Sequence, residues 1–157
     1  MKTKQQDLKT IRIYLTVFIV LLLLSGITAF PIRQEIAFLV TIKSYFPLFM
    51  QDWVEQLDTV LHQTPDVVLY GTDWLAFAHI VIAIAFIGPL KDPVRNSWVL
   101  QFGMIACVLI LPLALICGPI RGIPLFHQVI DCSFGLTGLI PLGICYGKTK
   151  ALERSFV

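Results

Sequence analysis

Three ionisable side chains interrupt long apolar segments of this sequence: His79, His127 and Asp131. Such side chains are costly in hydrocarbon, so in membrane proteins they usually face a bundle interior and mark a site. His127 and Asp131 are four residues apart, which places them on one face of a helix. A carboxylate in that position can orient an imidazole that takes up or releases a proton. We therefore expect His127, Asp131 and His79 to be the reactive residues.

Two further charged residues stand at the ends of the same apolar segments. Arg121 lies in a short turn six residues before His127, and a guanidinium is suited to binding a lipid phosphate or a carboxylate. Asp73 directly precedes the apolar segment that contains His79. We expect both side chains at the mouth of the site as substrate contacts. Asp73, or Thr72 before it, also has the chemistry of a helix cap.

The three ionisable residues are expected at similar depths in the membrane. A helix rises 1.5 Å per residue, so His79 lies about 7–8 Å from its end of the segment. His127 and Asp131 lie about 4–5 Å and about 10 Å from the corresponding end of theirs. The sequence therefore predicts that His79 and the His127/Asp131 pair approach a shared ligand or water.

Composition identifies the elements that must hold these residues. The 157-residue chain is 57% hydrophobic and 14% charged, whereas a soluble domain carries about 25% charged residues. Four apolar runs approach or reach the roughly 20 residues that cross a bilayer: 11–30, 74–90, 98–120 and 124–146. The predicted fold is all-α, an antiparallel bundle of four transmembrane helices that forms one integral-membrane domain over residues 1–157.

The basic residues predict the orientation of the bundle. Nine of the twelve flank the ends of the spans that lie on the same side as both termini: Lys2, Lys4, Lys9, Arg12, Lys91, Arg95, Lys148, Lys150 and Arg154. The positive-inside rule then places both termini in the cytoplasm and the protein in the plasma (inner) membrane. Cleavage of the first span as a signal peptide is not favoured, because residues 25–29 lack the small-x-small pattern.

The extracytoplasmic loop, residues 31–72, is expected to contain an amphipathic helix. Residues 47–62 have helical periodicity, and Pro47 suits a first turn. We expect a lid packed across the outer mouth; the alternative is a helix that lies in the membrane interface. Residues 70–73 resemble a turn, and Asp92-Pro93 resembles the start of the third span.

Several functions remain open. The leading hypothesis is a membrane protein that handles protons, a small anion or a lipid headgroup. A second is a non-catalytic subunit or scaffold whose polar residues hold helices together. A third is a metal site at His79, His127 and Asp131, which are suitable ligands for zinc or iron, or a haem ligated by His79 and His127. The sequence does not identify a cofactor, and a homo-oligomer is compatible with the glycine-bearing helix faces.

Two classes are excluded by the residues themselves. The topology is similar to that of the four-span membrane disulfide oxidoreductases, but residues 31–72 contain no cysteine. None of the four cysteines of the chain forms a Cys-x-x-Cys pair either. Nucleic-acid binding is also unexpected, because the basic residues are those that flank the spans and no basic stripe is left over.

Overall fold

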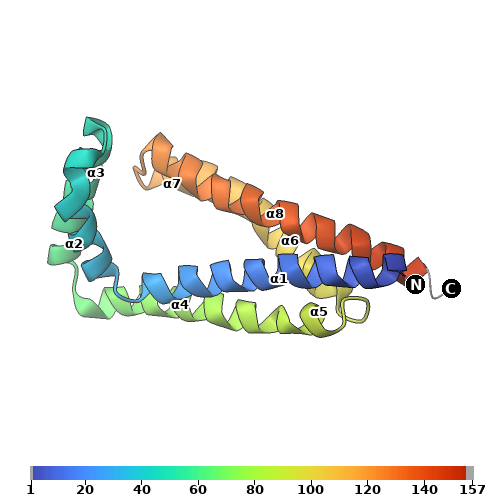
Figure 1. Cartoon of the computed structure of the whole chain (residues 1–157). Coiled ribbons are helices and arrows are strands. Elements are labelled where there is room, and N and C mark those ends of the chain that lie inside the picture. The colour runs from blue at the N-terminus through green and yellow to red at the C-terminus, as the bar shows by residue number, and fades with distance from the viewer. Residues whose placement is uncertain (1, 155–157) are drawn as a thin grey trace. The chain divides into compact units, whose positions relative to one another are not determined.

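The protein is described by a computed structural model for residues 2–154, with side chains from Lys4 onward, and these residues form a series of helices (Figure 1). In chain order the elements are α1 (Lys2–Ala29), α2 (Ile32–Ile42), η1 (Lys43–Tyr45), α3 (Leu48–Gln63), α4 (Asp66–Ala85), α5 (Ile87–Lys91), α6 (Ser97–Pro112), η2 (Leu113–Cys117), α7 (Gly118–Ile120) and α8 (Leu125–Arg154). Element η1 is a 3-10 helix and η2 is a π-helix.

Within the described residues, four helical segments are long and apolar enough to cross a membrane. They are Lys4–Ala29, Asp66–Lys91, Ser97–Ile120 and Leu125–Arg154. The prediction of four membrane-length helices is therefore confirmed. The second segment has 26 residues, more than the sequence suggested, because its helix begins earlier.

The prediction of a turn at residues 70–73 is wrong. Helix α4 starts at Asp66 and continues without a break through these residues. The Thr72 hydroxyl donates to the Leu69 carbonyl at 2.6 Å within the helix. Gly71 has open space around it, so the only unfavourable contribution of this residue to the stability of α4 is the weak helix propensity of glycine. Asp73 is consequently an interior residue of α4 and does not cap it.

The third span also begins later than Asp92-Pro93 suggests. Asp92 caps a turn, because its carboxylate accepts the Arg95 backbone N–H at 3.0 Å. The Asn96 side-chain amide donates to the Gly88 and Asp92 carbonyls, at 3.2 and 2.9 Å. These bonds hold residues 92–96 in a compact turn, and α6 starts after it at Ser97.

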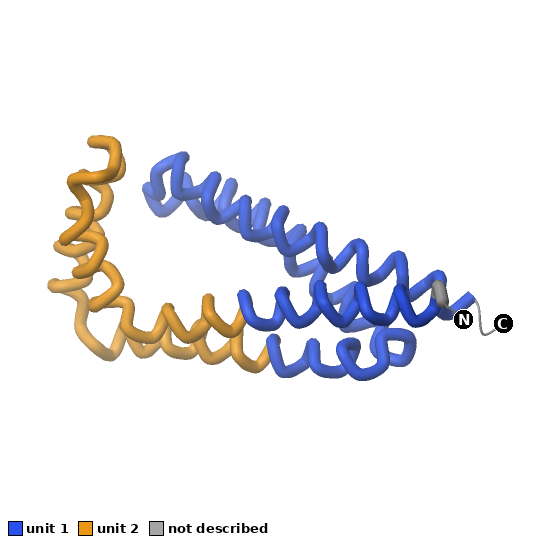
Figure 2. Tube along the Cα trace, in the orientation of Figure 1, with its two compact units in different colours: residues 1–21, 83–157 blue, residues 22–82 orange. Residues whose placement is uncertain are grey.

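The chain divides into two compact units, which Figure 2 colours separately. Unit 1 comprises Met1–Leu21 and Ala83–Val157, and unit 2 comprises Leu22–Ile82. Unit 1 contains most of the core, and its largest fully buried side chains are Phe86, Ile11, Leu15, Leu100, Leu142, Thr149, Pro89 and Cys145.

Helix α8 buries one continuous seam in unit 1. Its buried residues include Gln128, Gly135, Leu142 and Thr149, each seven residues after the one before. A repeat of seven keeps one stripe of an α-helix facing its neighbours along its length. The buried stripe therefore runs along α8 from the turn between α7 and α8 to the C-terminal part of the helix.

Helices α6 and α8 approach closely where this seam carries glycine. A Cβ atom on Gly135 would lie only 2.5 Å from the Cys107 carbonyl oxygen, and one on Gly138 would lie 2.9 Å from the Cys107 sulfur. On α6, a Cβ on Gly103 would lie 2.5 Å from the Phe86 ring. Small residues permit this kind of close helix packing in membranes.

The C-terminal part of α8 contacts α1 within unit 1. Lys148 forms an ion pair with Asp7 at 2.5 Å. The buried Cys145 thiol lies 3.7 Å from the Ile11 carbonyl, which it can donate to. Phe18 packs against the fully buried Phe86, with ring centroids 4.8 Å apart. Side chains from distant parts of the sequence thus share one core.

Unit 2 combines part of α1, the helices α2 and α3, and most of α4. A Cβ on Gly26 would lie 2.8 Å from the Ala76 carbonyl oxygen, so α1 and α4 are in direct contact there. Helices α2 and α3 pack together and run crosswise to the parts of α1 and α4 that belong to unit 2, residues 22–29 and 66–82 (Figure 1). Residues 47–62, expected as a helix, correspond to α3.

Arg33 fastens α2 to the junction between α3 and α4. Its guanidinium donates to the Leu61 and Thr64 carbonyls at 2.6 and 2.7 Å, and it pairs with the Asp66 carboxylate at 3.0 Å. The carbonyls at a helix C-terminus have no partner within the helix, so a basic side chain can complete them. Arg33 therefore links α2 to the end of α3 and to the start of α4.

Candidate polar site

The site begins at the turn between α7 and α8, which is held by backbone bonds. The Ile123 N–H donates to the Gly118 carbonyl at 2.9 Å, and the Gly122 N–H donates to the Pro119 carbonyl at 3.1 Å. Gly122 has φ of 69°, the left-handed conformation that glycine adopts most easily. This is the Schellman pattern of a helix C-terminus, and it presents Arg121 at the tip.

Gln128 stabilises this turn from the first part of α8. Its side chain is only 5% exposed, and its amide donates to the Ile123 carbonyl at 2.7 Å. A Cβ on Gly118 would lie 2.8 Å from the Gln128 side chain, so the amide fits against bare backbone. Gln128 was not among the residues expected at the site. A polar side chain one residue after His127, facing a glycine-bearing turn, was the signal that could have identified it.

His127 and Asp131 are in contact on α8. The His127 Nε2 lies 3.8 Å from an Asp131 carboxylate oxygen, and the two side chains are 37% and 41% exposed. The expected pairing across one helical turn therefore exists. His127 also stacks edge-on with Phe126, at a centroid distance of 6.3 Å. The pair thus places a carboxylate beside a half-exposed imidazole in unit 1.

Asp131 lies on the same seam that packs α8 into unit 1. It is three residues after the buried Gln128 and four before the buried Gly135, a spacing that keeps all three on one face. Asp131 therefore lies on the packing face of the helix, one turn before Gly135, where α8 meets Cys107 of α6. The half-exposed carboxylate remains accessible at that point of unit 1.

Arg121 does not join the pair. It is exposed, and within residues 2–154 it forms no ion pair with Asp131. Within the described residues, Asp131 therefore does not neutralise Arg121. Arg121 retains its positive charge at the tip of the turn, where its five N–H donors can bind an anion.

His79 lies in unit 2 and has a local partner. Its Nδ1 is 2.8 Å from the Leu75 carbonyl one turn earlier in α4. Its Cβ lies beside α1, because a Cβ on Gly26 would be 3.0 Å from it. The bond to Leu75 agrees with a helix-stabilising role. The approach of His79 to the His127/Asp131 pair stays a prediction.

A metal centre gains no support from the arrangement. Among the described residues 2–154, no group of three or more His, Cys, Asp or Glu side chains could hold a metal ion. The four cysteines are all free, with Cys107 and Cys145 buried, Cys132 half-buried and Cys117 exposed. The hypothesis of metal ligation by His79, His127 and Asp131 therefore rests on the sequence alone.

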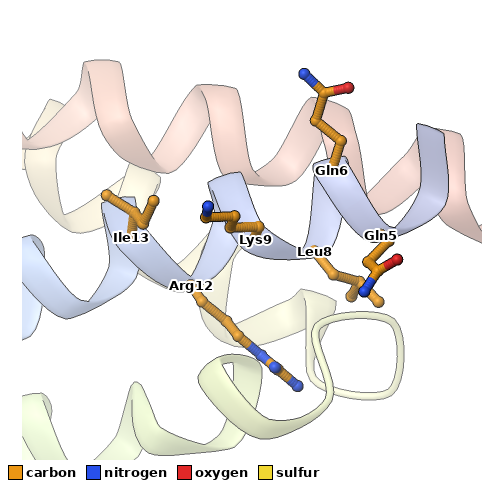
Figure 3. A pocket seen from close by; sticks show the side chains of 6 residues that line it. All are labelled: Gln5, Gln6, Leu8, Lys9, Arg12 and Ile13. Atoms are coloured by element: carbon orange, nitrogen blue, oxygen red, sulfur yellow. The ribbon is translucent and has the colours of Figure 1, made fainter. Parts of the chain in front are cut away.

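A hollow of about 550 Å³ lies elsewhere, along the first turns of α1 (Figure 3). Six side chains of this helix line it: Gln5, Gln6, Leu8, Lys9, Arg12 and Ile13. Lys9 and Arg12 are among the cations expected to flank a membrane span. A position at the end of a membrane-length segment accounts for both cations without a ligand.

Comparisons of this chain with protein-family models, with curated proteins and with solved structures find no match. The chemistry of the side chains and their placement in each unit therefore carry the functional argument.

Proposed function

We propose that this is an integral membrane protein that binds a small anion or an anionic lipid headgroup at the α7–α8 turn and couples binding to protonation of His127. The observation that carries the proposal is the 3.8 Å contact between His127 and Asp131, with an exposed Arg121 six residues before the pair. An anion would contact Arg121 and protonated His127, and Asp131 would hold the imidazole in position.

The proposed orientation has four antiparallel spans, cytoplasmic termini and the α7–α8 turn on the extracytoplasmic side of the plasma membrane. The distribution of basic residues supports it. Helices α2 and α3 would then lie along the extracytoplasmic surface, since they run crosswise to α1 and α4 (Figure 1). The exposed Leu48 and Phe49 of α3 suit an amphipathic helix in this place.

Binding of inorganic phosphate to the detergent-solubilised protein, measured by calorimetry, tests the proposal. Arg121→Gln should weaken binding by about fivefold, the upper range for an exposed charge pair. Arg95→Gln removes a cation from the turn between α5 and α6 and should leave the affinity unchanged. Equal losses in the two variants would mean that net charge, and not a site, attracts the anion.

The rival hypothesis is a non-catalytic subunit whose polar residues stabilise helix packing. The local bonds of His79 to Leu75 and of Gln128 to Ile123 favour it. The two hypotheses differ in what Asp131→Asn does. A structural role predicts a reduced yield of folded protein, whereas the binding role predicts a normal yield and an altered phosphate affinity.

A further inference from the structure

Unit 2 contains a hollow of about 280 Å³ that is lined by four aromatic rings and one carboxylate: Phe30, Tyr70, Asp73, Trp74 and Phe77. We call these five residues the aromatic box. Phe30 follows the end of α1, and the other four come from two successive turns of α4. The spacing of Tyr70, Trp74 and Phe77 brings the three rings to one side of that helix.

The rings of the aromatic box contact one another edge to face. The Tyr70 and Trp74 centroids are 6.0 Å apart at 78°, and those of Trp74 and Phe77 are 6.2 Å apart at 89°. All three side chains remain at least half exposed, so ring faces are available to a ligand. The faces of aromatic rings carry negative electrostatic potential and attract cations.

Asp73 adds a full negative charge that unit 2 does not neutralise. Among residues 2–154, Asp73 forms no ion pair. The two basic residues of unit 2 have other partners, since Arg33 pairs with Asp66 and Lys43 pairs with Glu55. A carboxylate within a membrane-length helix is costly without a counter-charge, so a cationic ligand beside Asp73 would lower that cost.

The composition of unit 2 also favours a cation. Residues 22–82 contain six acidic and two basic side chains, which leaves four net negative charges with histidine neutral. A surface with this balance raises the local concentration of cations. Asp73 was expected to act with Arg121 as a substrate contact, but the rings that surround Asp73 suit a ligand of positive charge.

We propose that the aromatic box binds an organic cation of the quaternary ammonium class, with its charge beside Asp73 and its methyl groups against the rings. The cation is either a free solute or the headgroup of a zwitterionic lipid, and the chemistry of recognition is the same. This site is independent of the anion proposed to bind at Arg121, because its residues belong to other elements.

The test is a titration of the purified protein with choline, followed by tryptophan fluorescence, to which Trp74 contributes together with Trp53 and Trp98. The expected result is a saturable change that the neutral isostere 3,3-dimethylbutan-1-ol does not produce. Asp73→Asn should weaken choline binding by about tenfold, and Tyr70→Leu by about fivefold, the range for a cation on an accessible ring. Trp98→Leu lies in unit 1 and should leave the titration intact.

The matched control for the carboxylate is Asp52→Asn, which removes an exposed acid from α3 of the same unit. It should change the choline affinity by less than about twofold, since a distant exposed charge is largely screened. Equal losses in Asp52→Asn and Asp73→Asn would overturn the proposal, because general surface charge would then explain binding. An equal response to the neutral isostere would also overturn it, and this result needs no variant to fold.

Two lipid environments identify the source of the cation. In nanodiscs of phosphatidylcholine, a headgroup that occupies the box would weaken the apparent choline affinity relative to nanodiscs of phosphatidylglycerol. Equal affinities in the two would identify a free solute as the ligand. A protein that binds choline in neither nanodisc nor detergent would contradict the proposal.

Discussion

The contact between α6 and α8 at Gly135 allows a quantitative test of the packing of unit 1. A methyl group on Gly135 would lie 2.5 Å from the Cys107 carbonyl oxygen, whereas ordinary C···O contacts are about 3.3 Å or longer. The obstacle is backbone and cannot rotate away. Gly135→Ala must therefore move the two helices apart by roughly 0.8 Å, the difference between those distances.

That displacement affects the neighbouring contacts along the seam. A radial gap of about 0.5–1 Å removes a quarter to a half of the dispersion energy of the atoms involved. Adding a methylene-sized group to a packed interface typically costs about 1–3 kcal/mol. The melting temperature of a chain of this size should then fall by roughly 3–10 °C.

Gly143→Ala is the matched control, because it lies on the same helix and an added methyl group there would have nothing within 4 Å. Alanine has the higher helix propensity, so this variant should be neutral or more stable by up to about 1 kcal/mol. Both variants are compared by thermal unfolding in detergent, followed by intrinsic fluorescence. Equal melting temperatures for Gly135→Ala and Gly143→Ala would refute the close approach of α6 and α8.

Two pairs of substitutions, each a variant with its control, test the α7–α8 turn and the α3–α4 junction. Gly122→Ala places a side chain at φ of 69° and should lower stability by about 1–2 kcal/mol. Its control, Gly71→Ala, lies in open space within α4 and should not lower stability. Thermal unfolding compares the two variants. Arg33→Gln should accelerate hydrogen exchange of the last amides of α3 and the first of α4, since the guanidinium holds this junction. Lys43→Gln, which removes only the ion pair with Glu55, should leave exchange at that junction unchanged, and equal effects would contradict the role of Arg33.

Much of the fold could be predicted from the long apolar runs, because a membrane-length segment with very few charges has few alternatives to a helix. The ends of the helices were harder to predict. Residues 70–73 have turn-forming types, yet α4 passes through them, since Asp66 already begins the helix and Gly71 meets no obstacle. Local residue preference is weak where a continuous helix satisfies all of its backbone bonds.

The candidate site was predictable only where it depends on spacing within one helix. The four-residue separation of His127 and Asp131 was sufficient to predict their contact. The buried amide of Gln128 was not predictable, because its environment is made by Gly118 across a turn. The aromatic box was missed for a similar reason, since Asp73 was interpreted as a helix cap and its aromatic neighbours were not considered together.

The most direct test of the central claim is the pH dependence of phosphate affinity in the wild-type protein and in His127→Gln. Histidine is the side chain that ordinarily changes charge between about pH 5 and 8. If His127 contributes its positive charge to the anion site, the wild-type affinity should rise severalfold more between about pH 8 and about pH 6 than that of His127→Gln. Parallel pH profiles for the two proteins would contradict the account.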